Sequence, residues 1–173
     1  MSSIGSLASS REMMEALSRE LARCARYDRP FSALLIGVDQ PGDPGVEVSG
    51  SYARALGRLI SRDVRSSDLV GRYGEAELLV LLPETPRQGA LVVAERLLAN
   101  AKRLPQSMTA AGRPPQPEIA IGVVEYGADT RSVHDFLNAA ERALQEARGQ
   151  SGNRMQVAES PRQEQPMGLR PVR

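Results

Sequence analysis

Apolar residues along this chain fall into short continuous runs that alternate with helical spacings. The run at 31–38 (FSALLIGV) is almost entirely apolar, which is typical of a central strand buried on both faces. Similar runs predict strands at 69–73, 77–82 and 118–125. Apolar spacings of three and four predict helices over 11–26, 51–65, 85–103 and from Ser132 to about residue 147, and a last short strand is predicted within 152–157.

The order of the central elements is strand, helix, strand, strand, helix, strand. This order predicts an α/β fold, with a ferredoxin-like sheet of about five strands and flanking helices. Polar segments that carry Pro or Gly predict loops at 39–50 and 104–117. From residue 159 the chain turns to Pro, Gln and Arg without periodicity, so we predict one domain over 1–158 and a disordered tail over 159–173.

Residues suited to capping precede three of the predicted helices. Ser9 or Ser10 stands before the first helix and Ser132 before the last. Thr85 is followed by Pro86 and then by a Gln at the capping-box position, so we predict a cap at Thr85 and Pro at the first helical position.

Composition excludes several classes of function. The net charge is +1 and the basic residues are not clustered, so we predict no nucleic-acid partner. No apolar run reaches the about 20 residues that span a bilayer, and no export signal opens the chain, so we predict a cytoplasmic protein with no membrane partner. Cys24 is the only cysteine and has core spacing, and His134 is the only histidine and has a surface pattern.

The most informative segment is 72–83 (RYGEAELLVLLP), which reads as two strand pieces around a glycine turn with acidic residues at its tip. It resembles the hairpin of the GGDEF family of diguanylate cyclases, which reads Arg-Tyr-Gly-Gly-Asp/Glu-Glu-Phe before an apolar strand that ends in Pro. The first glycine of that pattern is kept here. After Gly74, Glu75 replaces the second glycine and Ala76 replaces the first acid. Glu77 keeps the second acid, and Leu78 replaces the aromatic residue.

The resemblance extends beyond the hairpin, from about Ile4 to Val157, with elements in the family's order. The segments that carry it are 18–22 (SRELA), 26–32 (RYDRPFS), 65–74 (RSSDLVGRYG), 94–97 (AERL) and 139–154, which ends in Asn-Arg. It implies the GGDEF variant of a palm-type sheet.

The resemblance also implies where catalytic groups would lie. In this family, two magnesium ions held by carboxylates act on GTP. The matching metal positions here are Gly37 and Asp39 near the end of the first strand, and Ala76 in the hairpin. Because Gly37 and Ala76 carry no carboxylate, we predict no Mg²⁺ site and loss of diguanylate cyclase activity, so that the chain is not an enzyme. The alternative is a new cation site built from Asp39, Glu75 and Glu77.

Other substrate positions differ as well. The family reads guanine with an Asn and an Asp, and the matching positions carry Gly45 and Gly50. Its phosphate-binding Lys becomes Arg148, which we predict to be a phosphate contact, while the following Arg becomes Gly152.

A second site of the family is retained in sequence. Many GGDEF enzymes bind their product, cyclic di-GMP, at Arg-x-x-Asp just before the hairpin, helped by an Arg on the next helix. Arg65, Asp68 and Arg96 fill these positions. An Arg fork suits the O6 and N7 atoms of guanine, and a carboxylate accepts from its N–H groups. The alternative is local: Arg65 in the last turn of a helix, Asp68 as a cap, and Arg96 as a solvated helix residue.

These observations favour one function and leave two others open. The first is a catalytically inactive signalling protein that binds cyclic di-GMP at Arg65, Asp68 and Arg96 and regulates an unidentified partner protein. The second is a module for protein interaction or homodimerisation that binds no nucleotide. The third is a remodelled GTP-binding protein or a weakly active diguanylate cyclase.

Overall fold

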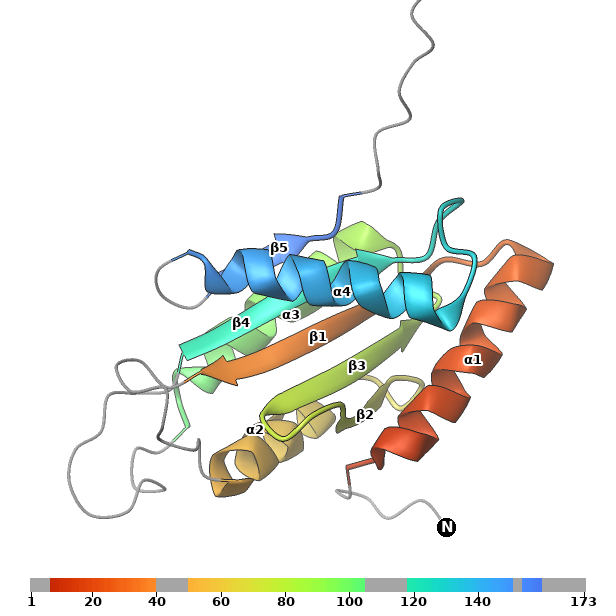
Figure 1. Ribbon diagram of the computed structural model, residues 1–173. Coiled ribbons are helices and arrows are strands. Elements are labelled where there is room, and N and C mark those ends of the chain that lie inside the picture. The colour runs from red at the N-terminus through yellow and green to blue at the C-terminus, as the bar shows by residue number, and fades with distance from the viewer. Residues whose placement is uncertain (1–6, 40–49, 105–117, 151–153, 160–173) are drawn as a thin grey trace, which may run out of the picture.

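The computed structural model describes residues 7–39, 50–104, 118–150 and 154–159 (Figure 1). In chain order the elements are α1 (Ser10–Tyr27), β1 (Phe31–Asp39), α2 (Gly50–Asp63), β2 (Leu69–Arg72), β3 (Glu77–Pro83), α3 (Arg87–Ala101), β4 (Glu118–Glu125), α4 (Val133–Arg148) and β5 (Arg154–Val157).

The strands form one 5-stranded mixed sheet in the order β2-β3-β1-β4-β5. Strand β1 lies at the centre and pairs antiparallel with both β3 and β4. Strand β2 pairs antiparallel with β3, whereas the short β5 runs parallel to β4. This arrangement, with helices on both faces, confirms the predicted ferredoxin-like α/β fold.

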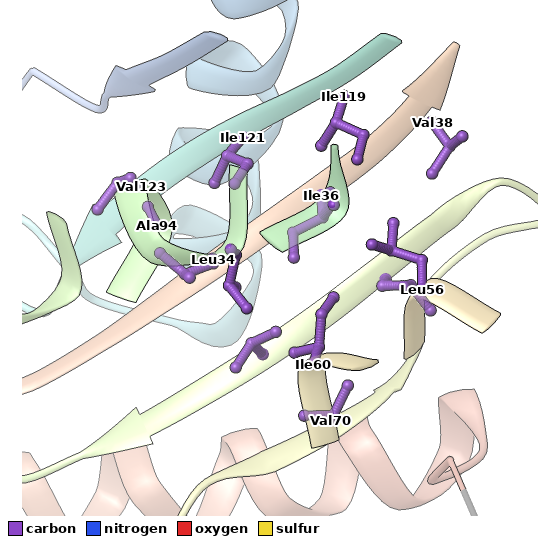
Figure 2. Packing of buried hydrophobic residues seen from close by; sticks show 14 of the residues in the cluster. Leu34, Ile36, Val38, Leu56, Ile60, Val70, Ala94, Ile119, Ile121 and Val123 are labelled. Carbon is purple, nitrogen blue, oxygen red and sulfur yellow. The ribbon is translucent and has the colours of Figure 1, made fainter. Parts of the chain in front are cut away.

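Strand β1 is buried from Phe31 to Val38, because its alternate residues enter two separate cores. Leu34, Ile36 and Val38 pack with α2 and α3 on one face of the sheet (Figure 2). Ala33 and Leu35 pack on the other face with α1 and α4. The sheet is therefore the middle layer of three.

Cys24 on α1 belongs to the core under α1 and α4, as its spacing predicts. Burial raises the pKa of its thiol. His134 lies exposed in the first turn of α4.

Two helices begin at the predicted serines. Ser9 caps α1 in a capping box: its Oγ accepts from the N–H of Glu12 at 3.3 Å, and the Glu12 carboxylate accepts from the N–H of Ser9 at 2.7 Å. Ser132 caps α4, where its Oγ accepts from the N–H of Asp135 at 3.1 Å.

The predicted cap at Thr85 is wrong. Pro86 is the N-cap of α3 and makes no side-chain cap bond, whereas Oε1 of Glu125 on β4 accepts from the N–H of Arg87 at 3.0 Å. The Thr85 hydroxyl instead donates to the carbonyl of Pro83 at 2.9 Å, and the Thr85 carbonyl accepts from the Ser32 hydroxyl at 2.8 Å. The Thr85 hydroxyl is thus oriented to the end of β3, and it accepts no bond from a helix N–H.

The segment before α1 covers the outer edge of β2. The N–H of Ala8 donates to Val70 at 3.0 Å, and the Ala8 carbonyl accepts from Arg72 at 2.9 Å. Gly71 allows this approach, since a Cβ there would lie 2.6 Å from the Ala8 carbonyl oxygen.

Most of the predicted loops at 39–50 and 104–117, and nearly all of the predicted tail at 159–173, lie outside the described residues, so these predictions and the domain boundary stay predictions. Across the described ranges we find no helical segment with the length and hydropathy of a transmembrane span.

Candidate functional site

The positions that the resemblance matches to catalytic groups meet at one end of the sheet. Gly37 and Asp39 lie at the end of β1, and Glu77 begins β3 directly opposite Gly37 in the strand register. The ladder continues into the turn, where the Ala76 carbonyl accepts from the N–H of Val38 at 3.0 Å. The fold therefore brings the carboxylates of Asp39 and Glu77 together at this end of the sheet.

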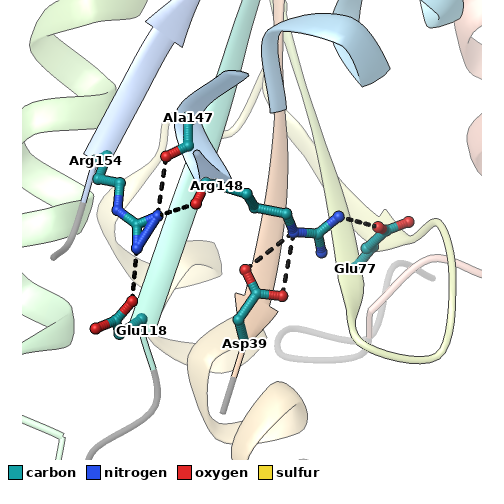
Figure 3. Close-up of polar contacts among 6 residues, drawn as sticks. All are labelled: Asp39, Glu77, Glu118, Ala147, Arg148 and Arg154. Atoms are coloured by element: carbon teal, nitrogen blue, oxygen red, sulfur yellow. Dashed lines mark hydrogen bonds and ion pairs between the residues drawn. The ribbon is translucent and has the colours of Figure 1, made fainter. Parts of the chain in front are cut away.

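Arg148, the last residue of α4, joins these two carboxylates (Figure 3). Its Nε donates to Oδ1 and Oδ2 of Asp39 at 3.1 and 2.9 Å, and its Nη1 donates to Oε1 of Glu77 at 3.2 Å. The three side chains are partly shielded, with exposed fractions of 22% for Arg148, 40% for Asp39 and 27% for Glu77. One guanidinium thus bridges two negative charges, although the sequence suggested a phosphate contact for Arg148.

Gly37 makes room for this guanidinium. A Cβ atom at position 37 would lie 2.5 Å from Nη2 and 3.0 Å from Cζ of Arg148. The guanidinium therefore rests against the backbone of β1, in space that any side chain at position 37 would occupy.

Arg154 holds the end of α4 from which Arg148 extends. Its Nη1 donates to the carbonyls of Ala147 and Arg148 at 3.0 and 2.6 Å, and its Nη2 donates to Oε2 of Glu118 at 2.6 Å (Figure 3). This side chain satisfies helix carbonyls that have no partner within the helix. Sequence reasoning missed this role, although an Arg soon after a helix with Gly149 as its C-cap was an available signal.

A second contact ties the hairpin to α4. The Tyr73 hydroxyl donates to the carboxylate of Glu141. Burial, above all, and then the bond to Glu141 and the charges of Glu141 and Glu77 raise the pKa of Tyr73. Glu75, by contrast, is exposed at the hairpin tip.

The donor set at this edge does not fit Mg²⁺ as it is arranged. Magnesium needs a near-octahedral set of oxygen ligands, whereas both carboxylates here already bind a guanidinium. Among the described residues no group of three or more His, Cys, Asp or Glu side chains is placed to hold a metal ion, so Glu75 does not complete a site with Asp39 and Glu77. The absence of Mg²⁺ from the working protein stays a prediction.

The second set of predicted residues lies between α2 and β2, close to α3. Asp68 closes a turn in which its Oδ2 accepts from the N–H of Arg65 at 2.8 Å and its own N–H donates to the Arg65 carbonyl at 3.0 Å. Arg96 on α3 donates from Nη2 to the carbonyl of Asp63 at 2.7 Å. Helix α2 ends at Asp63, so Arg65 follows the helix and does not lie in its last turn.

The carboxylate of Asp68 is only half satisfied. Its Oδ1 is buried and has no hydrogen-bond partner. Burial raises the pKa of Asp68, and the Arg65 N–H, the charges of Arg65 and Arg96 and the Ser67 hydroxyl oppose that rise. The charge of Arg96 therefore acts on Asp68, and the binding of a ligand by these residues stays a prediction.

Of the remaining predicted positions, Gly45 and Gly152 lie outside the described residues, and Gly50 is the first residue of α2.

The family model described as "Diguanylate cyclase, GGDEF domain" matches residues 3–154. The chain belongs to this family. A curated relative from Escherichia coli K12, named "Probable diguanylate cyclase DgcC", is 28% identical to this GGDEF domain over 148 residues. The match covers 82% of this chain and 38% of the relative, so the chain spans well under half of that protein's length.

Solved GGDEF structures share the fold of this domain. The diguanylate cyclase SiaD in complex with its activator SiaC, from Pseudomonas aeruginosa, superposes with a TM-score of 0.76 at 24% identity, over 90% of this chain and 60% of that one. The GGDEF domain of DgcB in complex with c-di-GMP, from Caulobacter crescentus, superposes with a TM-score of 0.72 at 15% identity, over 92% of this chain and 96% of that one.

These comparisons correct one prediction. We expected that this chain is not an enzyme, and that expectation is contradicted because the matched family is that of the diguanylate cyclases and the curated relative bears that name. The expectation rested on two positions, Gly37 and Ala76, whereas the family model matches the domain as a whole. Nothing in the comparisons indicates loss of activity, and the chain is a GGDEF, diguanylate cyclase-like signalling domain.

Proposed function

We propose that this GGDEF domain binds cyclic di-GMP at Arg65, Asp68 and Arg96 and passes the signal to a partner protein. The buried, unpartnered Oδ1 of Asp68 is the observation that carries the proposal. A buried acceptor without a partner costs about 1–3 kcal/mol. Because this oxygen has almost no exposed surface, a ligand recovers that cost when the turn at 65–68 opens to admit its donor. The N–H groups at the edge of a guanine base are such donors.

The two arginines complete a site for a guanine base and a phosphate. The Arg65 side chain is exposed and, in the part of the chain that the structure describes, has no ion-pair or hydrogen-bond partner, so it can turn to a ligand. Arg96 is held by the Asp63 carbonyl and lies near Asp68. Guanidinium groups pair with phosphate oxygens in two-pronged fashion and stack on bases.

Two solved structures of the same fold support the proposal by analogy. One GGDEF domain of the same fold was solved with c-di-GMP, and one diguanylate cyclase was solved with a protein activator. By analogy we propose a regulatory protein as the partner of this domain, and a homodimer is the second form of assembly to test.

Calorimetric titration with cyclic di-GMP tests the ligand. We expect saturable binding by the wild-type protein and a loss of at least about tenfold in affinity for Arg65→Ala and for Asp68→Asn. Arg62→Ala, which removes an exposed arginine from the last turn of α2, is the matched control and should bind as the wild type does. No binding by the wild type, or equal binding by all variants, would refute the site and favour the nucleotide-independent interaction module.

The family match favours a second candidate, the formation of cyclic di-GMP from GTP by this domain. Asp39 and Glu77 are the two carboxylates that the fold brings together at the position of the family's active site. The test is incubation with GTP and Mg²⁺, with the product detected by mass spectrometry. Product formed by the wild type and not by Glu77→Gln would support this candidate, and no product from either would remove it.

A further inference from the structure

Arg148 lies where two negative charges from neighbouring strands would otherwise face each other. Asp39 is two residues beyond Gly37, and Gly37 is the register partner of Glu77, so β1 and β3 bring both carboxylates to one edge. We propose that the Arg148 guanidinium is the resident cation of this edge and that it excludes a divalent cation from Asp39 and Glu77. This proposal concerns a different place in the fold from the cyclic di-GMP site and does not depend on it. It is an alternative to the second candidate function, so Mg²⁺-dependent product formation that requires Glu77 would count against it.

The hydrogen bonds leave little for a competing cation. The Nε–H of Arg148 lies 3.1 and 2.9 Å from the two oxygens of Asp39, so the inner lone pair of each oxygen, the pair that a chelated cation would use, faces the guanidinium. Its Nη1 lies 3.2 Å from one oxygen of Glu77. A metal ion needs these same oxygens, and two cations cannot share them at short range because their charges repel.

The guanidinium also fills the space beside β1 at this end of the sheet. The missing side chain of Gly37 is what allows Nη2 to lie beside the strand, since a Cβ there would be 2.5 Å away. Glycine at position 37 therefore leaves space for the guanidinium, and arginine at position 148 provides the positive charge.

The guanidinium is also anchored without help from any ion. Arg148 ends α4, where a positive charge is favoured by the helix dipole. Its backbone carbonyl accepts from Arg154, which in turn pairs with Glu118 at the start of β4. The base of the side chain is thereby fixed to the sheet.

Binding of Mn²⁺, followed by electron paramagnetic resonance of the free ion, tests the proposal. We expect Arg148→Met to bind Mn²⁺ at least about tenfold more tightly than the wild type, because two carboxylates lose their cation. Arg142→Met removes an exposed arginine of α4 that has no ion-pair partner among the described residues, and it should match the wild type. Adding Asp39→Asn to Arg148→Met should abolish the gain. A difference of less than about twofold between Arg148→Met and the wild type would overturn the proposal.

A second measurement needs no variant. Bound Mn²⁺ broadens nearby NMR signals, so the amide signals of Val38, Asp39 and Glu77 in the wild-type protein should stay sharp while Mn²⁺ is added. Selective broadening of these three signals at low ion concentration would contradict the proposal, whatever the variants do. Cyclic di-GMP binding by Arg148→Met should equal that of the wild type, which keeps this test separate from the ligand test at Arg65.

Discussion

Gly37 sets how close the end of α4 comes to the central strand. Replacing it with alanine places a methyl group where the Arg148 guanidinium lies. We expect Gly37→Ala to lower the free energy of unfolding by no more than about 1 kcal/mol, the low end of the cost of overpacking, because the guanidinium ends a flexible side chain that can shift. Urea denaturation measures this change. Gly127→Ala is the control, because a Cβ at Gly127 meets nothing within 4 Å.

The same substitution in an Arg148→Ala background separates crowding from other effects. With the guanidinium gone, Gly37→Ala should be neutral or slightly stabilising, because alanine restricts the unfolded chain more than glycine does. An unchanged cost in this background would show that Arg148 is not what Gly37 accommodates.

Asp68 makes stability depend on pH in an uncommon direction. Burial raises the pKa of its carboxyl above the ordinary value of 3.8, so the folded protein holds this proton at a higher pH than the unfolded chain does. Its contribution to stability therefore falls as pH rises from about 3.8 through the folded pKa. Asp68→Asn removes this step and should gain stability relative to the wild type between pH 4 and pH 7.

Urea denaturation at several pH values measures the difference between Asp68→Asn and the wild type. Asp129→Asn, at an exposed carboxylate, controls for the loss of one negative charge. A difference between Asp68→Asn and the wild type that does not change with pH would mean that burial does not govern this carboxyl.

Helix α4 is the element that carries Arg148 to the sheet, and side chains fix both of its ends. Ser132 caps the first turn and Arg154 binds the last carbonyls. Ser132→Ala should cost about 1 kcal/mol of unfolding free energy, measured by urea denaturation, whereas Ser132→Asp should retain the cap. Equal losses in the two variants would mean that the cap does not stabilise the helix.

The helices and strands could be predicted from the sequence. Apolar runs and three-four spacings predicted every described strand and helix, because period and burial are local signals. Ser9 and Ser132 cap as expected, since an N-cap bond joins residues three apart. The prediction at Thr85 failed because contacts with the ends of β3 and β1 orient this residue, and only the folded sheet determines those contacts.

The side-chain contacts at the candidate site could not be predicted from local sequence patterns. Arg148 meets Asp39 across 109 positions of sequence and Glu77 across 71. Inspection of single positions showed which carboxylates were missing, but not which group had entered the space they left. The prediction that the chain is not an enzyme was also wrong. It relied on two substituted positions, whereas the family model matches residues 3–154.

In the whole molecule the two proposed sites lie at opposite ends of the β2–β3 hairpin. Glu77 starts β3, whereas Asp68 precedes Leu69, which pairs with Leu81 near the end of β3. The four residue steps from Glu77 to Leu81 separate them by about 13 Å along the strand. We expect the stability changes of Arg65→Ala and Arg148→Met to add within about 0.5 kcal/mol in the double variant, as for independent sites.

Thermal or urea unfolding of the two single variants and the double variant measures this sum. A clear departure from additivity would indicate that the hairpin couples the cyclic di-GMP site to the Arg148 edge.

The bond pair between Ala8 and β2 bears on how copies of this domain can meet. An unpaired strand edge is a template for a strand from another molecule, and a sheet with two such edges can grow without limit. Here the Val70 carbonyl and the Arg72 N–H are already taken by the chain's own N-terminal segment. Among the described strands this leaves the outer side of β5 as the edge without a strand partner, so we expect any pairing of native copies through their sheets to use β5.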